Sequence, residues 1–181
     1  MFQQDRIRIL IGVSIVGFAA PLWWVFAGAI ATHMRRIEGT HYPLTRIQVA
    51  CAGGTAVIIL LEVWLVLAIC FRPNIEPSAV QLANDFIWLT FVGFYPPGVL
   101  QNVVIGTCIL TDKSETPIFP RWVGFANFWM ALGFMPGIYI VFFKSGPFAW
   151  DGILGFWIIA LCFFAWIGMM WWSVVRAVKQ A

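Results

Sequence analysis

The chain has 181 residues, of which 61% are hydrophobic, 17% aromatic and only 10% charged. Soluble domains carry about 45–50% apolar and about 25% charged residues, so this balance excludes a soluble enzyme, a nucleic-acid-binding protein and a disordered chain. The mean hydropathy of +0.87 agrees with that exclusion. We therefore expect an integral membrane protein whose main partner is the lipid bilayer and which binds no nucleic acid.

Five stretches of the sequence avoid charge, and each is long enough for a membrane-spanning helix, which needs about 20 apolar residues. Backbone amides in lipid are satisfied within their own segment, and continuous apolar runs do not fit the alternating strands of a barrel. The sequence predicts an all-α bundle of five transmembrane helices in a single domain, residues 1–181. The predicted spans are 9–32, 47–71, 86–111, 122–143 and 152–175.

Prolines interrupt three of the five predicted helices. Pro21 lies in the first span, Pro96 and Pro97 lie in the third, and Pro136 lies in the fourth. A proline inside a helix removes a backbone donor and clashes with the preceding turn, which bends the helix. Helices 1, 3 and 4 are therefore predicted to be kinked.

The distribution of lysine and arginine predicts the orientation, because cytoplasmic loops carry an excess of these residues. An outer N-terminus puts seven of them inside and four outside. This favours a cytoplasmic C-terminus, in a plasma membrane or a bacterial inner membrane. The inner residues are Arg35, Arg36, Arg46, Lys113, Arg121, Arg176 and Lys179, and the outer ones are Arg6, Arg8, Arg72 and Lys144.

The inner loop between the first two spans carries a basic patch and two histidines. Its arginines are expected to meet anionic lipid headgroups at ~1 kcal/mol each. His33 and His41 flank Glu38, but such a loop lacks fixed geometry and a fourth ligand, so no metal site is predicted. The headgroup residues are Arg35, Arg36 and Arg46.

Glu62 is the one charged residue inside the five spans. A charge at that depth costs from about 3 to more than 10 kcal/mol, and such residues are functional candidates by default. No Lys, Arg or His lies at comparable depth, so burial favours the neutral acid. At helical spacing Glu62 shares a face with Cys51, Thr55, Ile58 and Ile59.

Further polar residues lie on the third and fourth predicted helices. Tyr95 falls at nearly the depth of Glu62, and the prolines behind it free the carbonyls of Val92 and Gly93, which could face Glu62. Two interpretations remain open. These side chains either hold the helices together by hydrogen bonds or line a ligand cavity between the second, third and fourth helices. The remaining candidates are Gln101, Asn102 and Asn127.

Tryptophan is unusually frequent, with 11 residues. Those near the span ends fit an interfacial belt, whereas four lie well inside their spans: Trp64, Trp129, Trp157 and Trp166. Aromatic walls with a few polar groups suit a flat or apolar ligand such as a sterol, quinone, tetrapyrrole, carotenoid or lipid tail. Plain packing against helices and lipid explains them as well. Trp64 and Trp129 join Glu62 in the predicted ligand site.

Two function hypotheses follow. In the first, the protein binds or transports a hydrophobic or amphipathic small molecule in an aromatic-lined cavity that contains Glu62. In the second, it is a non-catalytic structural or accessory subunit of a homo-oligomer or of a larger membrane complex. No catalytic motif is present, so no catalytic residue is predicted and an enzyme is not expected. The sequence leaves the cofactor and the ligand unnamed.

Overall fold

The computed structural model describes residues 5–72, 75–93 and 95–180. The fold is 85% helical and the described residues contain no strand. The elements are α1 (Arg6–Glu38), η1 (Gly39–His41), α2 (Pro43–Phe71), α3 (Pro77–Gly93), α4 (Tyr95–Thr111), α5 (Arg121–Phe134), η2 (Met135–Val141), η3 (Ile153–Trp157) and α6 (Ile158–Lys179). The all-α prediction is confirmed.

Within the described residues, four continuous helical segments are long and apolar enough to cross a membrane. They are Arg6–His41, Pro43–Phe71, Arg121–Val141 and Ile153–Lys179. These segments contain four of the five predicted spans, apart from a few residues at the ends of the fourth and fifth. Their length and composition indicate an integral membrane protein.

The structure describes the third predicted span as two helices, one on each side of residue 94. Residues 86–111 are divided between α3 and α4, each of 17 residues, and α3 begins at Pro77, well before the predicted start. Pro96 and Pro97 lie in the first turn of α4, where the missing backbone donors would have no helical acceptor anyway. The prolines thus lie where the first turn of a helix tolerates them.

The other prolines differ in effect. At Pro136 the chain changes from the α-helix α5, which ends at Phe134, to the 3₁₀-helix η2, which begins at Met135. Pro21 lies inside α1 without ending it. A change of helix type therefore accompanies Pro136, whereas α1 continues through Pro21.

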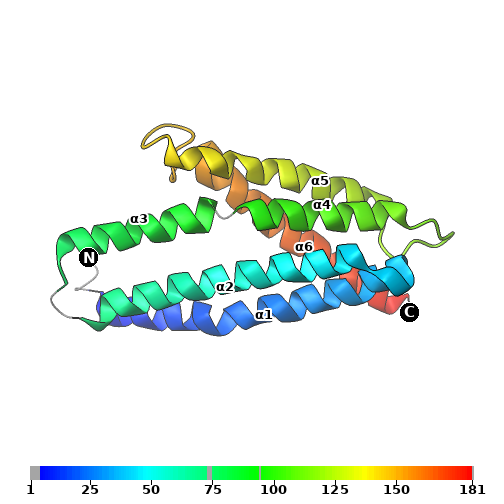
Figure 1. The fold of residues 1–181 in the computed structure, drawn as a ribbon, viewed down its shortest axis with the longest axis horizontal. Coiled ribbons are helices and arrows are strands. Elements are labelled where there is room, and N and C mark those ends of the chain that lie inside the picture. The colour runs from blue at the N-terminus through cyan, green and yellow to red at the C-terminus, as the bar shows by residue number, and fades with distance from the viewer. Residues whose placement is uncertain (1–4, 73–74, 94, 181) are drawn as a thin grey trace.

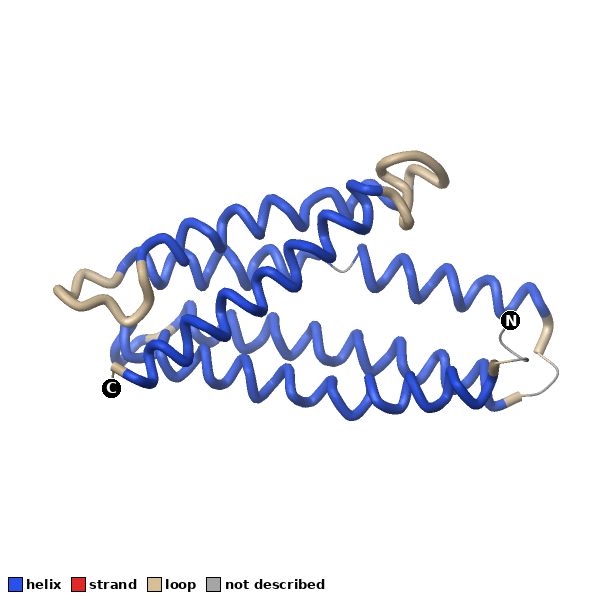
Figure 2. The backbone as a smooth tube through the Cα atoms, turned by 180° about the vertical axis from the view of Figure 1, so that it is seen from behind, coloured by secondary structure: helices blue, strands red, loops and turns tan. Residues whose placement is uncertain are grey.

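The helices run along one long axis (Figure 1). The antiparallel pair of α1 and α2 forms one side, α4 and α5 form the other, and α6 crosses diagonally between the two sides, as the view from behind also shows (Figure 2). Helices α3 and α4 follow one another along the same direction. The main buried cluster joins α1, α4 and α6 through Ile30, Met34, Ile105, Ile109 and Met170.

Two glycines allow the close approach of α5 to its neighbours. A Cβ atom at Gly106 of α4 would lie only 2.8 Å from the carbonyl oxygen of Gly124 in α5. A Cβ atom at Gly133 of α5 would overlap the Cys162 Sγ of α6. Small residues at helix contacts are the usual means of tight packing in a membrane. These contacts hold α5 tightly against α4 and α6.

The turn between α1 and α2 is closed by Glu38. Its carboxylate accepts hydrogen bonds from the backbone amides of Leu44 (2.9 Å) and Thr45 (2.7 Å) and from the Thr45 hydroxyl. These amides belong to the first turn of α2, which has no acceptor within its own helix and carries a partial positive charge. Glu38 therefore caps α2, while His33 is buried edge-on against Phe119.

The predicted headgroup arginines lie at this same end of the bundle and are all exposed. The guanidinium carbons of Arg35 and Arg46 lie 4.4 and 4.6 Å from the centre of the Tyr42 ring. Cation–π contact of this kind holds two of the three cations together beside the turn. Binding of lipid headgroups by Arg35, Arg36 and Arg46 stays a prediction.

Asp112 fixes the next loop at this end. Its carboxylate accepts hydrogen bonds from the Ser114 amide (3.0 Å), the Ser114 hydroxyl (2.6 Å) and the Ile118 amide (3.0 Å). Burial alone would raise the pKa of Asp112, but these hydrogen bonds outweigh it and hold the pKa below its ordinary value. Asp112 therefore stays ionised at neutral pH and keeps the connection between α4 and α5 compact.

Replacing Glu38 by Gln tests the cap. The substitution removes the charge and one of the two acceptor oxygens, so we expect a loss of about 1–3 kcal/mol in unfolding free energy, as for hydrogen bonds to charged groups. Unfolding by SDS in mixed micelles, followed by helical circular dichroism, measures the loss. Glu115→Gln, at an exposed loop position, is the matched control. Equal destabilisation by both substitutions would contradict the role of Glu38.

Candidate binding cavity

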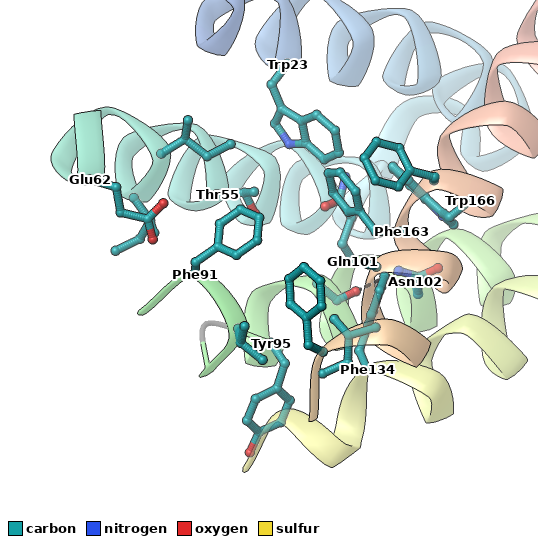
Figure 3. Close-up of a pocket in the computed structure, with 18 residues that line it drawn as sticks. Trp23, Thr55, Glu62, Phe91, Tyr95, Gln101, Asn102, Phe134, Phe163 and Trp166 are labelled. Atoms are coloured by element: carbon teal, nitrogen blue, oxygen red, sulfur yellow. Dashed lines mark hydrogen bonds between the residues drawn. The ribbon is translucent and has the colours of Figure 1, made fainter. Parts of the chain in front are cut away.

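An apolar cavity of about 310 Å³ lies where α2, α3, α4 and α6 meet. Its wall combines three polar side chains of the predicted site, Glu62, Gln101 and Asn102, with a larger set of aromatic rings (Figure 3). Tyr95, also a predicted site residue, belongs to that aromatic set. The aromatic residues are Trp23, Phe91, Tyr95, Phe134, Phe156, Phe163, Phe164 and Trp166.

Glu62 lies at one end of the cavity, and Asn102 and Trp166 lie toward the other (Figure 3). The glutamate side chain is only 8% exposed. Its Oε1 atom lies 3.0 Å from the Thr90 hydroxyl of α3. Sequence reasoning missed Thr90, although it is the only polar residue between Phe86 and Gly93 and therefore stands out in an apolar helix.

The predicted contacts of Glu62 with the start of α4 are not formed. The Tyr95 hydroxyl points away from Glu62, toward η2 (Figure 3). The carbonyl oxygen of Val92 faces Gly137 of η2, where an added Cβ atom would lie 2.7 Å from it. The depth estimate placed Tyr95 at nearly the level of Glu62 in the membrane. It did not give the direction in which the groups point, and the Tyr95 hydroxyl (Figure 3) and Val92 O both face η2.

Gln101 and Asn102 lie side by side on α4, and both are almost fully buried, at 3% and 2% exposure. Asn102 Nδ2 donates to the carbonyl oxygen of Gly98 (2.8 Å), one turn earlier in α4. Asn102 Oδ1 and Trp23 Nε1 are buried polar atoms of the cavity wall without a hydrogen-bond partner among the described residues. Buried polar atoms in proteins are normally paired, so these two are exceptions in the wall of this cavity.

Asn127, a predicted ligand residue, lies outside the cavity lining and acts on its wall instead. It is fully buried in α5, and its Oδ1 accepts a hydrogen bond from Trp166 Nε1 (2.9 Å) of α6. Its Nδ2 donates to the Val123 carbonyl (2.8 Å). The interpretation of interhelical hydrogen bonding therefore describes Asn127, while Glu62, Gln101 and Asn102 line the cavity.

The two tryptophans predicted for the site, Trp64 and Trp129, lie on the outer surface. Their side chains are 58% and 72% exposed, and neither is part of the cavity lining. Each follows a buried polar residue by two positions, Glu62 and Asn127, which at about 100° per residue turns it by about 200° around the helix. A tryptophan two positions from an inward-facing residue points outward.

Trp166 and its neighbours on α6 form a large part of the wall, which the sequence did not predict because α6 is apolar on all sides. Trp23 of α1 stacks on Phe163, with ring centres 5.4 Å apart and planes at 15°. Trp166 lies 5.8 Å from the same Trp23 ring. These rings close the cavity on the side of α1 and α6.

The start of α6 adds one more aromatic side chain. Residues Ile153–Trp157 form a π-helical turn, and Phe156 within it lines the cavity. Gly155 in this turn lies so close to the preceding loop that an added Cβ atom would overlap the Ala149 carbonyl oxygen. The backbone amides of Leu154 (2.8 Å) and Gly155 (3.1 Å) also donate to Pro147 O. The loop therefore fixes the position of this turn.

Glu62 and Tyr95 are the ionisable side chains in the described lining, and no lysine, arginine or histidine is part of it. Arg6 contacts α2 at Phe71 O (3.0 Å), nine residues or about 13 Å along the helix from Glu62. Comparison with known protein families, with curated proteins and with solved structures gives no match. The chemistry of the cavity therefore carries the functional argument by itself.

Removing the acceptor of Trp166 tests the support of the cavity wall. Asn127→Leu leaves the buried Trp166 Nε1 without a partner, so we expect a loss of about 1–3 kcal/mol in unfolding free energy. The double variant Asn127→Leu/Trp166→Phe should lose less than the sum of the two single substitutions, because no unpaired donor remains. SDS unfolding measures all three variants, with Gln81→Leu, at an exposed amide, as the control. Strictly additive losses would contradict the coupling.

Proposed function

We propose that this protein binds a hydrophobic or amphipathic small molecule within the membrane, in the cavity between α2, α3, α4 and α6. The observation that carries the proposal is the convergence of one carboxyl and two amides in an otherwise aromatic cavity of about 310 Å³. Ligand sites are typically concave, mostly apolar and of about 300–1,000 Å³, with a few placed polar groups. A purely structural bundle has no need for such a space.

The side of the cavity that opens outward also supports a ligand from the bilayer. Phe91 of α3 and Phe164 of α6 both line the cavity and are 55% and 69% exposed. Both lie in apolar helices, so the surface around the opening would face hydrocarbon. A molecule already dissolved in the bilayer would reach Glu62 without crossing water.

Filling the cavity tests the binding. Ala160 of α6 lines it, so Ala160→Leu places additional side-chain atoms in the space. Native mass spectrometry of protein extracted in a mild, lipid-preserving detergent should show a reproducible added mass on the wild type. We expect this mass to be lost in Ala160→Leu and retained in Ala165→Leu, its matched control at an exposed position of the same helix.

An added mass that survives Ala160→Leu would contradict binding in this cavity. Masses explained by other polypeptides alone would favour the accessory-subunit hypothesis. Glu62→Gln separates the two roles of the glutamate: a ligand-contacting carboxyl predicts a weaker complex, whereas a carboxyl that serves packing alone predicts a change in stability without a change in the added mass.

For the membrane topology, we propose five crossings with the N-terminus outside and the C-terminus in the cytoplasm. Helices α3 and α4 run one after the other in the same direction and would make one crossing between them (Figure 1). The α1–α2 turn, the α4–α5 loop and the end of α6 lie at the same end of the bundle. That end carries the seven basic residues expected on the cytoplasmic side.

Reporter fusions test the topology. We expect a reporter that is active only in the cytoplasm to work when fused after residue 180 or inserted after Glu115, since both positions lie at the basic end. We expect a reporter that is active only outside to work when inserted after Gly146, in the loop at the opposite end. Activity of an outside-only reporter at the C-terminus would overturn the orientation.

A further inference from the structure

Glu62 is a buried carboxyl group in a cavity to which the described residues contribute no positive charge. From α1 the cavity wall receives Trp23, from α5 Phe134 and from α6 a series of aromatic and aliphatic residues. From α3 and α4 it receives apolar and amide side chains together with Tyr95, which besides Glu62 is the ionisable residue of the described lining. An ionised Glu62 therefore has no counter-ion from this chain, and the uncompensated charge would be costly at this depth.

The hydrogen bonds of Thr90 indicate how the empty cavity avoids that cost. Thr90 Oγ1 lies 2.7 Å from the carbonyl oxygen of Phe86 and 3.0 Å from Glu62 Oε1. A hydroxyl group has one proton, so it donates to one of these oxygens only. Donation to Phe86 O, the shorter contact and the usual one for a helical threonine, leaves the Thr90 oxygen to accept a proton from Glu62. Both contacts are then hydrogen bonds if Glu62 is a neutral acid.

Aromatic rings surround the space next to this acid. Phe91 lies beside Glu62, and Trp23 and Phe163 follow toward the far end of the cavity (Figure 3). The faces of such rings attract cations, by about 0.5–2 kcal/mol or more per contact when water is excluded, and aromatic cages are a common way to recognise quaternary ammonium groups. The cavity thus offers a carboxyl and several rings, and lacks a cation.

We propose that the cavity binds a lipophilic organic cation in exchange for the proton of Glu62. The cation would lie among the aromatic rings with its charge near the carboxyl group, and the O–H bond of Glu62 would break so that one proton leaves for each cation that binds. The net charge of the cavity is then the same before and after binding. This inference rests on the proposed function and specifies the chemical class of ligand for the same site.

The experiment uses three probes of similar shape and different charge: tetraphenylphosphonium, tetraphenylborate and the uncharged triphenylmethane. The full chain is reconstituted in nanodiscs of phosphatidylcholine, a lipid without net charge, and binding is measured by equilibrium dialysis with empty nanodiscs as the partition control. We expect saturable binding of the phosphonium alone, with an affinity that rises about tenfold per pH unit over the range in which the empty site holds Glu62 as a neutral acid, because one proton is released per bound cation. A pH indicator in weak buffer should report about one proton released per bound cation.

Variants assign the effect to the carboxyl group. Glu62→Gln should weaken phosphonium binding about tenfold and abolish both its pH dependence and the proton release. Glu62→Asp keeps an ionisable group and should retain the proton release. Glu115→Gln, in an exposed loop, should behave as the wild type, and Ala160→Leu should block binding. Helical circular dichroism and gel filtration verify that each variant is folded before binding is measured.

The other outcomes overturn the inference in distinguishable ways. Equal binding of phosphonium and triphenylmethane that Ala160→Leu blocks but Glu62→Gln does not affect would leave a cavity for neutral molecules and refute the role of charge. Phosphonium binding without proton release would refute the exchange. Binding of none of the probes above the empty-nanodisc control, together with no cavity-dependent added mass in native mass spectrometry, would refute the proposed function as well.

Discussion

The structure depends on how a carboxyl group is kept inside an apolar helix. Glu62 lies within α2, whose other residues from Ile47 to Phe71 carry no charge. In an apolar surrounding each polar group needs a hydrogen-bond partner from the protein itself, because water does not reach it. The hydroxyl group of Thr90 supplies one partner from α3. The second oxygen of the carboxyl remains free for the cavity, so one residue both links two helices and provides the most reactive group of the candidate site.

The end of α3 and the start of α4 line part of the space that this carboxyl faces. With Pro96 and Pro97 in the first turn of α4, the backbone amides needed to continue α3 are absent. The end of α3 is instead packed on η2, where Gly137 approaches Val92 O. Phe91 and Tyr95 thereby come to line the wall.

The apolar character of the helices also limits what the sequence can predict. Continuous hydrophobic runs located α1, α2 and α6, and spacing along α2 correctly placed Thr55, Ile58 and Ile59 on the face of Glu62. Rotation about the helix axis was the harder problem, because a helix that is apolar on all sides does not mark its inner face. Trp129 was therefore assigned to the site although it points outward, while the contribution of α6 to the wall was missed. The indole of Trp166 was a usable signal for the inner face of α6, since a buried indole N–H needs an acceptor and Asn127 supplies it.

The contacts that hold the cavity wall in place lie outside the cavity itself. Their position affects the selectivity that the cavity can have. Close glycine contacts join α4, α5 and α6, Asn127 holds Trp166, and Glu38 fixes the turn between α1 and α2. The rings that face the space are thus held from behind and do not need a ligand to keep their places. Apolar walls distinguish molecules of slightly different shape weakly, by about 1–3 kcal/mol per methylene, whereas an unpaired charge in such a site costs far more. A site of this composition would therefore accept a range of apolar shapes and select among them by charge through the carboxyl group of Glu62.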